Sequence, residues 1–217
     1  MSLSTLVNRI NMELIKISRW LIINKISLNV KKTNFILSTG KKKNIDNMSA
    51  IKIDNTIIEW VANTQLLGIA INESLTWSDH IKKVCNKVNK SINIIYRFRK
   101  ILPSRILINL YFAIVHPHFV YCNIVWASLH STVLQNLFMK QKKAMCLITN
   151  SPGNSHSAPI FAKLNILSLF NINKLQTGCF MYNVSRGLLP LNFANIFRMN
   201  NDVHSHNTRL RDHSHVI

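Results

Sequence analysis

The sequence predicts an α+β fold in which one helix and a small antiparallel β-element are followed by a mainly α-helical region. Between residues 32 and 72, short apolar runs are separated by turn-forming Asn, Asp and Gly, as in β-hairpins. From residue 76 onward, apolar residues recur at intervals of three and four, which is the spacing of one helical face. The chain has 217 residues, of which 47% are apolar, and this is enough to bury a hydrophobic core.

The chain is expected to begin with a helix over residues 6–24. Its apolar positions lie at helical spacing, at Leu6, Ile10, Leu14, Ile17 and Leu21. Residues 32–39 are predicted as a buried strand, because Phe35 and Leu37 share one face within an apolar run. The polar residues 40–44 are expected to form a loop.

A β-hairpin is predicted over residues 51–61. Ile51 and Ile53 alternate with polar residues on the first strand, and Asp54-Asn55 has the composition of a hairpin turn. The apolar residues that follow, up to Trp60, belong to the return strand.

A further strand and the start of a long helix follow. Residues 66–71 are predicted as a strand, in which Gly68 marks a bulge or a close backbone approach. A helix is expected over residues 77–101. Thr76 is a suitable N-cap for it, and Asp79 places a negative charge near the positive end of the helix dipole.

This long helix is predicted to be amphipathic. One side carries the apolar residues, at Ile81, Val84, Cys85, Val88, Ile92 and Ile95. The opposite side carries cations, at Lys82, Lys83, Lys87, Lys90 and Arg97, with Lys100 at the end. The apolar side is therefore expected to face a core, and the cations are expected to face solvent or an anionic partner.

The remaining chain is predicted to be helical. Helices are expected over residues 104–115, 117–128, 131–149 and 168–187, with a loop at 150–159 and a loose polar tail from residue 200. The apolar segment at residues 106–129 has the length of a membrane span, but His116, Pro117, His118 and Asn123 interrupt it. A buried helix of a soluble domain is the favoured interpretation, and no membrane span is expected.

The charge of the chain points to an anionic partner. There are 27 Lys and Arg residues against 8 Asp and Glu residues, which gives a formal net charge of +19. Such an excess of positive charge repels itself unless a polyanion lies against it. Nucleic acid is the favoured partner, and an anionic membrane surface is the second choice.

The distribution of the acidic residues restricts the chemistry. No Asp or Glu lies between Asp79 and Asp202. A general base of the carboxylate type, or a carboxylate site for Mg²⁺, therefore cannot be built from that section alone. No metal site and no catalytic residue is predicted in this chain.

Several segments, in order, resemble the reverse transcriptases of non-LTR retrotransposons, especially the jockey-like group. They are WLIINKISLNVKKTNFI (20–36), LLGIAINESLTWSDHIKKV (66–84), LYFAIVHPHFVYCNIVWAS (110–128), KQKKAMCLITNSP (140–152), GLLP (187–190) and HSHNTR (204–209). The resemblance extends over nearly the whole chain, from residue 20 to residue 209. Each segment alone is only suggestive, whereas their order and spacing are fairly specific.

The resemblance implies a role for each part of the chain. It implies a palm remnant with a primer-grip-like hairpin over residues 1–75, a basic thumb-like region over 76–150, and a C-terminal helical region over 151–217. The hairpin that grips the primer strand would include Leu67, Gly68 and Ile69. The long basic helix would open the thumb and contact the template–primer duplex through Lys82, Lys83, Lys87, Lys90, Arg97 and Lys100, with Trp77 and His80 near its start.

The resemblance also implies that this chain is catalytically incomplete. Polymerases of this group hold two metal ions with aspartates, including an Asp-Asp pair, and this sequence has no such pair. Asn72 stands where the family has an Asp. We therefore expect no polymerase activity and no cofactor, since Mg²⁺ belongs to the full-length enzyme. The expected partners are an RNA–DNA hybrid or duplex and the N-terminal polymerase portion. The alternative is a non-catalytic interaction protein with an incidental basic surface.

Overall fold

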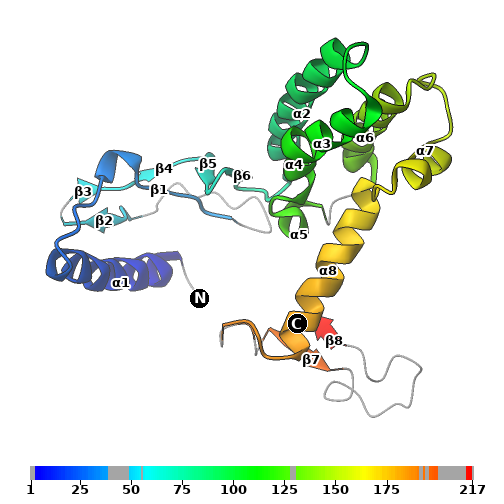
Figure 1. Cartoon of the computed structure of the whole chain (residues 1–217). Helices are drawn as coiled ribbons and strands as arrows, with labels where there is room; N and C mark the ends of the chain where they lie inside the picture. Colours follow the sequence, from blue (N-terminus) through cyan, green and yellow to red (C-terminus); the bar gives the residue numbers. More distant parts are fainter. Residues whose placement is uncertain are drawn as a thin grey trace. The chain divides into compact units, whose positions relative to one another are not determined.

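The computed structural model describes residues 3–38, 49–54, 56–127, 131–190, 193, 196–199 and 214–216. It confirms the α+β class, with short two-stranded sheets near the N-terminus and helices after them (Figure 1). The chain forms two compact units, one over 1–86 with 129–133 and the other over 87–128 with 134–217. We call these unit 1 and unit 2. Their boundary falls inside a helix, whereas the sequence-based divisions at residues 75 and 150 remain predictions.

Unit 1 begins with helix α1, Leu3–Ile23, in agreement with the predicted helix at 6–24. Its core side chains are Val7, Ile51, Ile53 and Ile58, against which the partly buried Ile10, Leu14, Leu28, Val30 and Phe35 pack. Helix α1 is thus fixed on the first hairpin by its apolar face.

Polar contacts fasten α1 to the same hairpin. The Asn11 side chain donates to the Ala50 carbonyl at 3.2 Å and accepts the Lys52 amide at 3.0 Å. Ser18, which is almost fully buried, donates a hydrogen bond from its hydroxyl to the Asp54 carboxylate. These bonds explain why polar residues occur on the packed side of the helix.

The predicted hairpin at 51–61 is present in part. Strand β2, Lys52–Ile53, pairs antiparallel with β3, Thr56–Ile57. The return strand does not continue to Trp60, because β4, Glu59–Trp60, pairs instead with β1, Asn34–Phe35, in a parallel register. The strand predicted at 32–39 is therefore much shorter, and a 3₁₀ turn (η1, Val30–Lys32) precedes it. The loop predicted at 40–44 lies outside the described residues.

The strand predicted at 66–71 is present in part, because Ile69–Ile71 belong to a strand but a turn interrupts the segment. Strand β5, Asn63–Leu66, and strand β6, Ile69–Asn72, form an antiparallel hairpin, and Leu67-Gly68 is its two-residue turn. Both turn residues have positive φ angles, 47° and 85°, as a type I′ turn requires. Gly68 marks the turn because it adopts this conformation without a Cβ clash, rather than marking a bulge.

Leu67 is an unfavourable residue for its place in this turn. A β-carbon in the left-handed region costs roughly 1–2 kcal/mol, and Leu67 is 81% exposed, so little burial offsets the strain. Replacing Leu67 with Asn, which type I′ turns prefer, should raise the free energy of unfolding by about 0.5–1 kcal/mol. Urea denaturation of the wild type and the variant measures this difference. An unchanged or lower midpoint would contradict it.

Helix α2, Ser78–Phe98, continues from unit 1 into unit 2. Unit 2 then contains α3 (Ser104–Ile114), α4 (His116–Val120), α5 (Asn123–Trp126), α6 (Ser131–Thr149), α7 (Ser157–Leu164) and α8 (Leu169–Ser185). No helix in the described ranges is long and apolar enough to cross a membrane.

The predicted helix at 117–128 is confirmed only in part, because the chain breaks into the two short helices α4 and α5. The break lies at Tyr121–Cys122, where Cys122 has a φ of 49°. The carbonyls left open by the break are satisfied by side chains: Asn123 donates to Phe119 at 2.8 Å and the Trp126 indole donates to Tyr121 at 2.9 Å. These bonds lie within the unit and are formed by residues that a pattern of apolar spacing treats as ordinary helix positions.

Helix α7 was not predicted, because part of it lies in the segment read as a loop. The signals for it were Pro159 in its first turn and Asn165 directly after it. Asn165 adopts a left-handed φ of 52°, as residues that end helices do. The short length of α7 hid the apolar periodicity that identified the longer helices.

The C-terminal part holds one further strand pair. Strand β7, Phe197–Met199, pairs antiparallel with β8, Ser214–Val216. The tail predicted to be loose from residue 200 otherwise lies outside the described residues.

Candidate nucleic-acid interface

Helix α2 has the two-sided character that its sequence predicts. Its apolar side is buried, with Ile81, Val84, Val88, Ile92 and Ile95 all 6% exposed or less. The six cations proposed as nucleic-acid ligands, Lys82, Lys83, Lys87, Lys90, Arg97 and Lys100, are all exposed. The burial of one side fixes the direction in which the other side faces.

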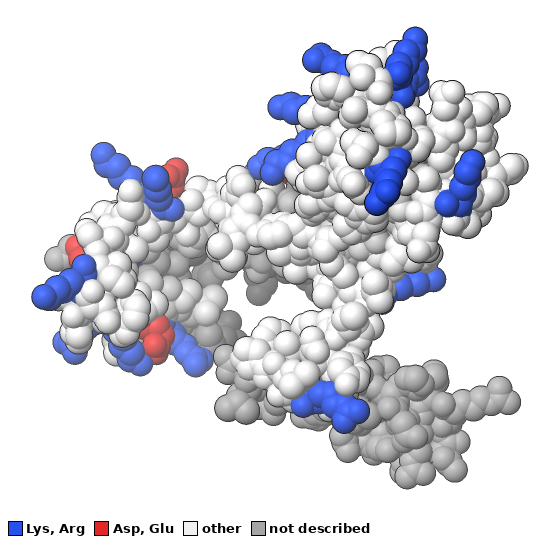
Figure 2. All heavy atoms as spheres, in the orientation of Figure 1, with Lys and Arg blue, Asp and Glu red and all other residues white. Residues whose placement is uncertain are grey.

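These cations are poorly neutralised within the part of the chain that the structure describes. Lys82 forms an ion pair with Asp79 at 3.3 Å. Both partners are more than half exposed, so the pair contributes little to stability. Among the described residues, none of the other five cations forms an ion pair. Figure 2 shows Lys and Arg side chains gathered over the helical elements of unit 2, with no acidic side chain visible there on this face.

The spacing along the helix suits a linear polyanion. Lys83, Lys87, Lys90 and Arg97 lie at intervals of four, three and seven residues, which places them on nearly the same side. From Lys87 to Arg97, which both lie in unit 2, the helix rises about 15 Å at roughly 1.5 Å per residue. That rise matches about four phosphates of one strand at roughly 3.4 Å each.

A second helix adds positive charge beside α2 within unit 2. The Lys140 ammonium of α6 donates to the Asn89 side chain of α2 at 2.9 Å. Lys143, on the same helix as Lys140, is exposed. On α4, the pKa of His118 is lowered, first by burial and then by the nearby Lys87. The ammonium of Lys87 therefore disfavours a further positive charge at His118.

The end of α2 carries a cation and an aromatic ring in contact. The Arg99 guanidinium lies 4.4 Å from the centroid of the Tyr96 ring, and Tyr96 is 53% exposed. Arg99 directly follows the last residue of α2 and is half-buried. Its planar group is thus held in place by the ring.

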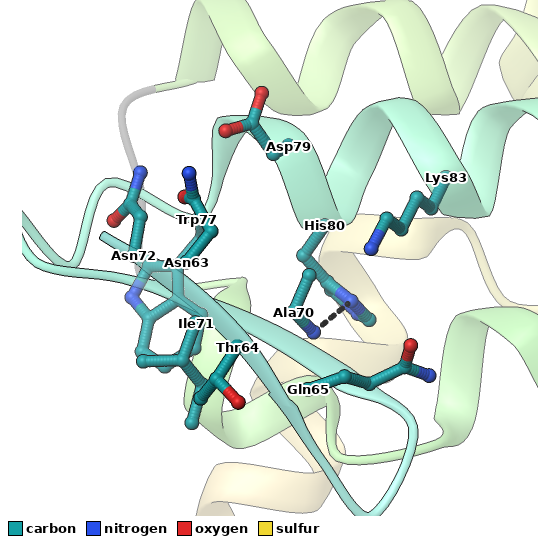
Figure 3. A pocket seen from close by; sticks show the side chains of 10 residues that line it. All are labelled: Asn63, Thr64, Gln65, Ala70, Ile71, Asn72, Trp77, Asp79, His80 and Lys83. Carbon is teal, nitrogen blue, oxygen red and sulfur yellow. Dashed lines mark hydrogen bonds between the residues drawn. The ribbon is translucent and has the colours of Figure 1, made fainter. Parts of the chain in front are cut away.

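His80 does not face solvent. It is 5% exposed, and its Nδ1 accepts the backbone N–H of Ala70 at 3.3 Å (Figure 3). The imidazole therefore connects the β5–β6 hairpin to the first turn of α2. His80 positions the helix and is not available as a surface ligand, which corrects its assignment as a nucleic-acid contact.

The loop before α2 is held by Asn72 rather than by an N-cap at Thr76. The Asn72 side chain accepts the Thr76 amide at 2.9 Å and donates to the Thr76 hydroxyl at 2.8 Å. Thr76 lies outside the helix, which begins at Ser78. Trp77, between them, has a φ of 56°, which is uncommon for a bulky residue.

The hairpin and the start of α2 together border a pocket of about 430 Å³. Its lining includes Trp77 and Lys83 from the two sides of the space, and Asn63, Gln65 and Asn72 from the hairpin (Figure 3). The sequence analysis placed Trp77 and Lys83 among the nucleic-acid contacts, but not the side-chain amides of Asn63, Gln65 and Asn72. A polar residue on a short strand carries no signal for a pocket until the register of the hairpin is known. The primer-grip-like residues Leu67 and Gly68 lie at the hairpin tip, and Ile69, which begins β6, is 6% exposed.

Two observations bear on chemistry. Within the described residues, no group of three or more His, Cys, Asp and Glu side chains could hold a metal ion.

In unit 2, burial lowers the pKa of His116 and raises the pKa of Tyr111 to about 12. Both side chains are therefore uncharged near neutral pH.

Comparison of the chain with protein-family models, with curated proteins and with solved structures found no match.

Proposed function

We propose that this chain binds the phosphate backbone of a nucleic acid through the solvent-facing cations of α2. The observation that supports this most directly is that five cations lie exposed along α2, whose other side is buried, and a sixth, Lys100, lies exposed just after its end. Without a polyanion, these charges repel one another. A rigid helix holds them at fixed spacing, so that little conformational entropy is lost when phosphates bind.

We further propose that the chain derives from an RNA-directed DNA polymerase and is catalytically incomplete. The support is the order of the sequence segments that resemble the jockey-like group, together with the absence of an Asp-Asp pair from the 217 residues. The proposed ligand is an RNA–DNA hybrid or duplex. Incubation of the purified chain with primed template, nucleotides and Mg²⁺ should give no extension.

The binding proposal is tested by replacing Lys87, Lys90 and Arg97 with Gln. Each backbone contact contributes a slope of about −0.9 to log K against log salt, so the triple variant should reduce the slope by about 2.7. Affinity should fall for every sequence alike, because phosphates carry no sequence information. Fluorescence anisotropy with a labelled hybrid of about 20 base pairs, between about 50 and 200 mM salt, gives both quantities.

The control is a triple variant of equal net charge, with Gln at Lys163, Lys174 and Arg186. These residues are exposed on or after α7 and α8 and lie outside α2. The control should keep most of the slope. If both triple variants lose affinity equally, the effect comes from net charge alone and the α2 assignment is wrong.

An interaction protein with an incidental basic surface is the second candidate. Large apolar side chains of α1 are exposed, including Trp20 at 57%, Ile22 at 69% and Ile23 at 78%. Exposed apolar groups in such number suit a protein contact. Absence of hybrid binding by the wild type at low salt, in the same anisotropy experiment, would leave this candidate alone.

A further inference from the structure

We propose that the pocket between the β5–β6 hairpin and the start of α2 accepts one unstacked nucleobase together with its phosphate. This ligand is distinct from the duplex backbone, and of the six proposed cations only Lys83 also lines the pocket. The pocket lies wholly within unit 1, and its volume of about 430 Å³ is within the range of small-molecule sites.

One side of the pocket is formed by an aromatic side chain that is not buried in the hydrophobic core. Trp77 is half-buried, and its indole borders the pocket (Figure 3). Trp77 is held in a left-handed conformation, at a φ of 56°, by a loop that the Asn72–Thr76 hydrogen bonds fix. Backbone strain of this kind costs about 1–3 kcal/mol and occurs often at ligand sites. Stacking on an indole suits any nucleobase, since every base has a π-face.

Amide groups stand where they can read the edge of a base. Asn63 and Gln65 lie two positions apart on β5, so they share one side of the hairpin. Among the described residues, neither amide has a hydrogen-bond partner. An amide offers a donor and an acceptor together, as base edges require.

The charges of the pocket suit one phosphate rather than several. Lys83 lines the pocket, is exposed, and has no ion-pair partner in the described part of the chain. Asp79 also lines the pocket, and its carboxylate, paired with Lys82, disfavours a polyphosphate nearby. The carboxylate can instead accept a hydrogen bond from a base amino group or a sugar hydroxyl. The chemistry that fits is therefore a nucleoside monophosphate, either free or within a single strand.

Two titrations test the proposal and identify the source of the ligand. Adenosine 5′-monophosphate is titrated by calorimetry, and a single-stranded oligonucleotide with one 2-aminopurine is titrated by fluorescence, since stacking quenches this base. Inorganic tripolyphosphate, which has no base, serves as competitor. We expect quenching that tripolyphosphate does not reverse. Binding of adenosine 5′-monophosphate would identify a free nucleotide as a ligand. Quenching of 2-aminopurine without binding of adenosine 5′-monophosphate would identify the ligand as a base within a single strand.

The variants are Trp77→Leu and Asn63→Ala, with Trp20→Leu as the matched control because Trp20 is exposed on α1. Loss of the indole should weaken binding about tenfold, in the range found for base–aromatic stacking. Asn63→Ala, at an exposed site that leaves the fold intact, should weaken it severalfold. The control variant Trp20→Leu should change the affinity for the oligonucleotide less than twofold.

The outcomes separate this proposal from the backbone proposal. Asn63→Ala should keep the salt-dependent binding of the hybrid, whereas the Lys87, Lys90 and Arg97 triple variant should keep the 2-aminopurine quenching. The pocket proposal is overturned if both pocket variants, folded by circular dichroism, bind as tightly as the wild type. It is also overturned if tripolyphosphate reverses the quenching, or if neither ligand binds the wild type.

Discussion

Replacing Gln141 with Leu should lower the free energy of unfolding by about 3–5 kcal/mol. Gln141 is fully buried in α6. Its amide nitrogen donates to the Tyr111 hydroxyl at 3.0 Å and to the Leu167 carbonyl at 2.9 Å, and its oxygen accepts the Leu169 amide at 2.7 Å. Leu fills a similar volume but leaves these three polar groups without their partner, at roughly 1–3 kcal/mol for each buried group.

The effect should be local to the contacts of Gln141. Gln135→Leu is the matched control, because Gln135 is exposed on the same helix. It should change stability by less than about 0.5 kcal/mol. Urea denaturation followed by circular dichroism measures both variants. A loss of less than about 1 kcal/mol for Gln141→Leu would show that water or a shift of the helices replaces the hydrogen bonds.

Replacing Trp126 with Ala should cost about 3–5 kcal/mol, since it leaves a large cavity in the core. Trp126 is 0% exposed and ends α5. Its indole also donates to the Tyr121 carbonyl, at the break between α4 and α5. The variant therefore loses both packing and the partner of a carbonyl that the break leaves open.

Trp126→Phe separates these two contributions. Phe keeps most of the buried apolar surface but cannot donate the hydrogen bond, so the loss should be about 1–2 kcal/mol. Trp20→Ala, at an exposed position on α1, should cost less than about 1 kcal/mol. Thermal and urea denaturation of the three variants would check the order. Equal losses for Trp126→Phe and Trp126→Ala would mean that the hydrogen bond, and not the packing, governs this site.

The long helices could be predicted because burial alone determines their pattern. In α2, the predicted apolar residues Ile81, Val84, Val88, Ile92 and Ile95 are all buried, Cys85 is half-buried, and the predicted cations are exposed. A 21-residue helix repeats its apolar face several times, so the period is clear in the sequence. The cationic face of the candidate interface was predictable for the same reason.

The short elements could not be predicted in this way. The strands of unit 1 have two to four residues, too few for an alternating pattern to show. Leu67-Gly68 reads as part of a strand until β5 and β6 are seen to pair. Likewise, the apolar run through Tyr121 and Cys122 is periodic enough for one helix, and only the bonds from Asn123 and Trp126 to the carbonyls before the break reveal two.

The sequence by itself determined the α+β class, the position of the basic helix and the absence of an Asp or Glu from residues 80–201. These depend on composition and on the period of apolar residues, which are local properties of the chain. Only the tertiary structure decided that His80 is buried against Ala70 and that Trp77 and the amides of β5 border one pocket. These depend on which residues the β5–β6 register and the loop held by Asn72 bring together, and no local pattern encodes contacts between separate elements.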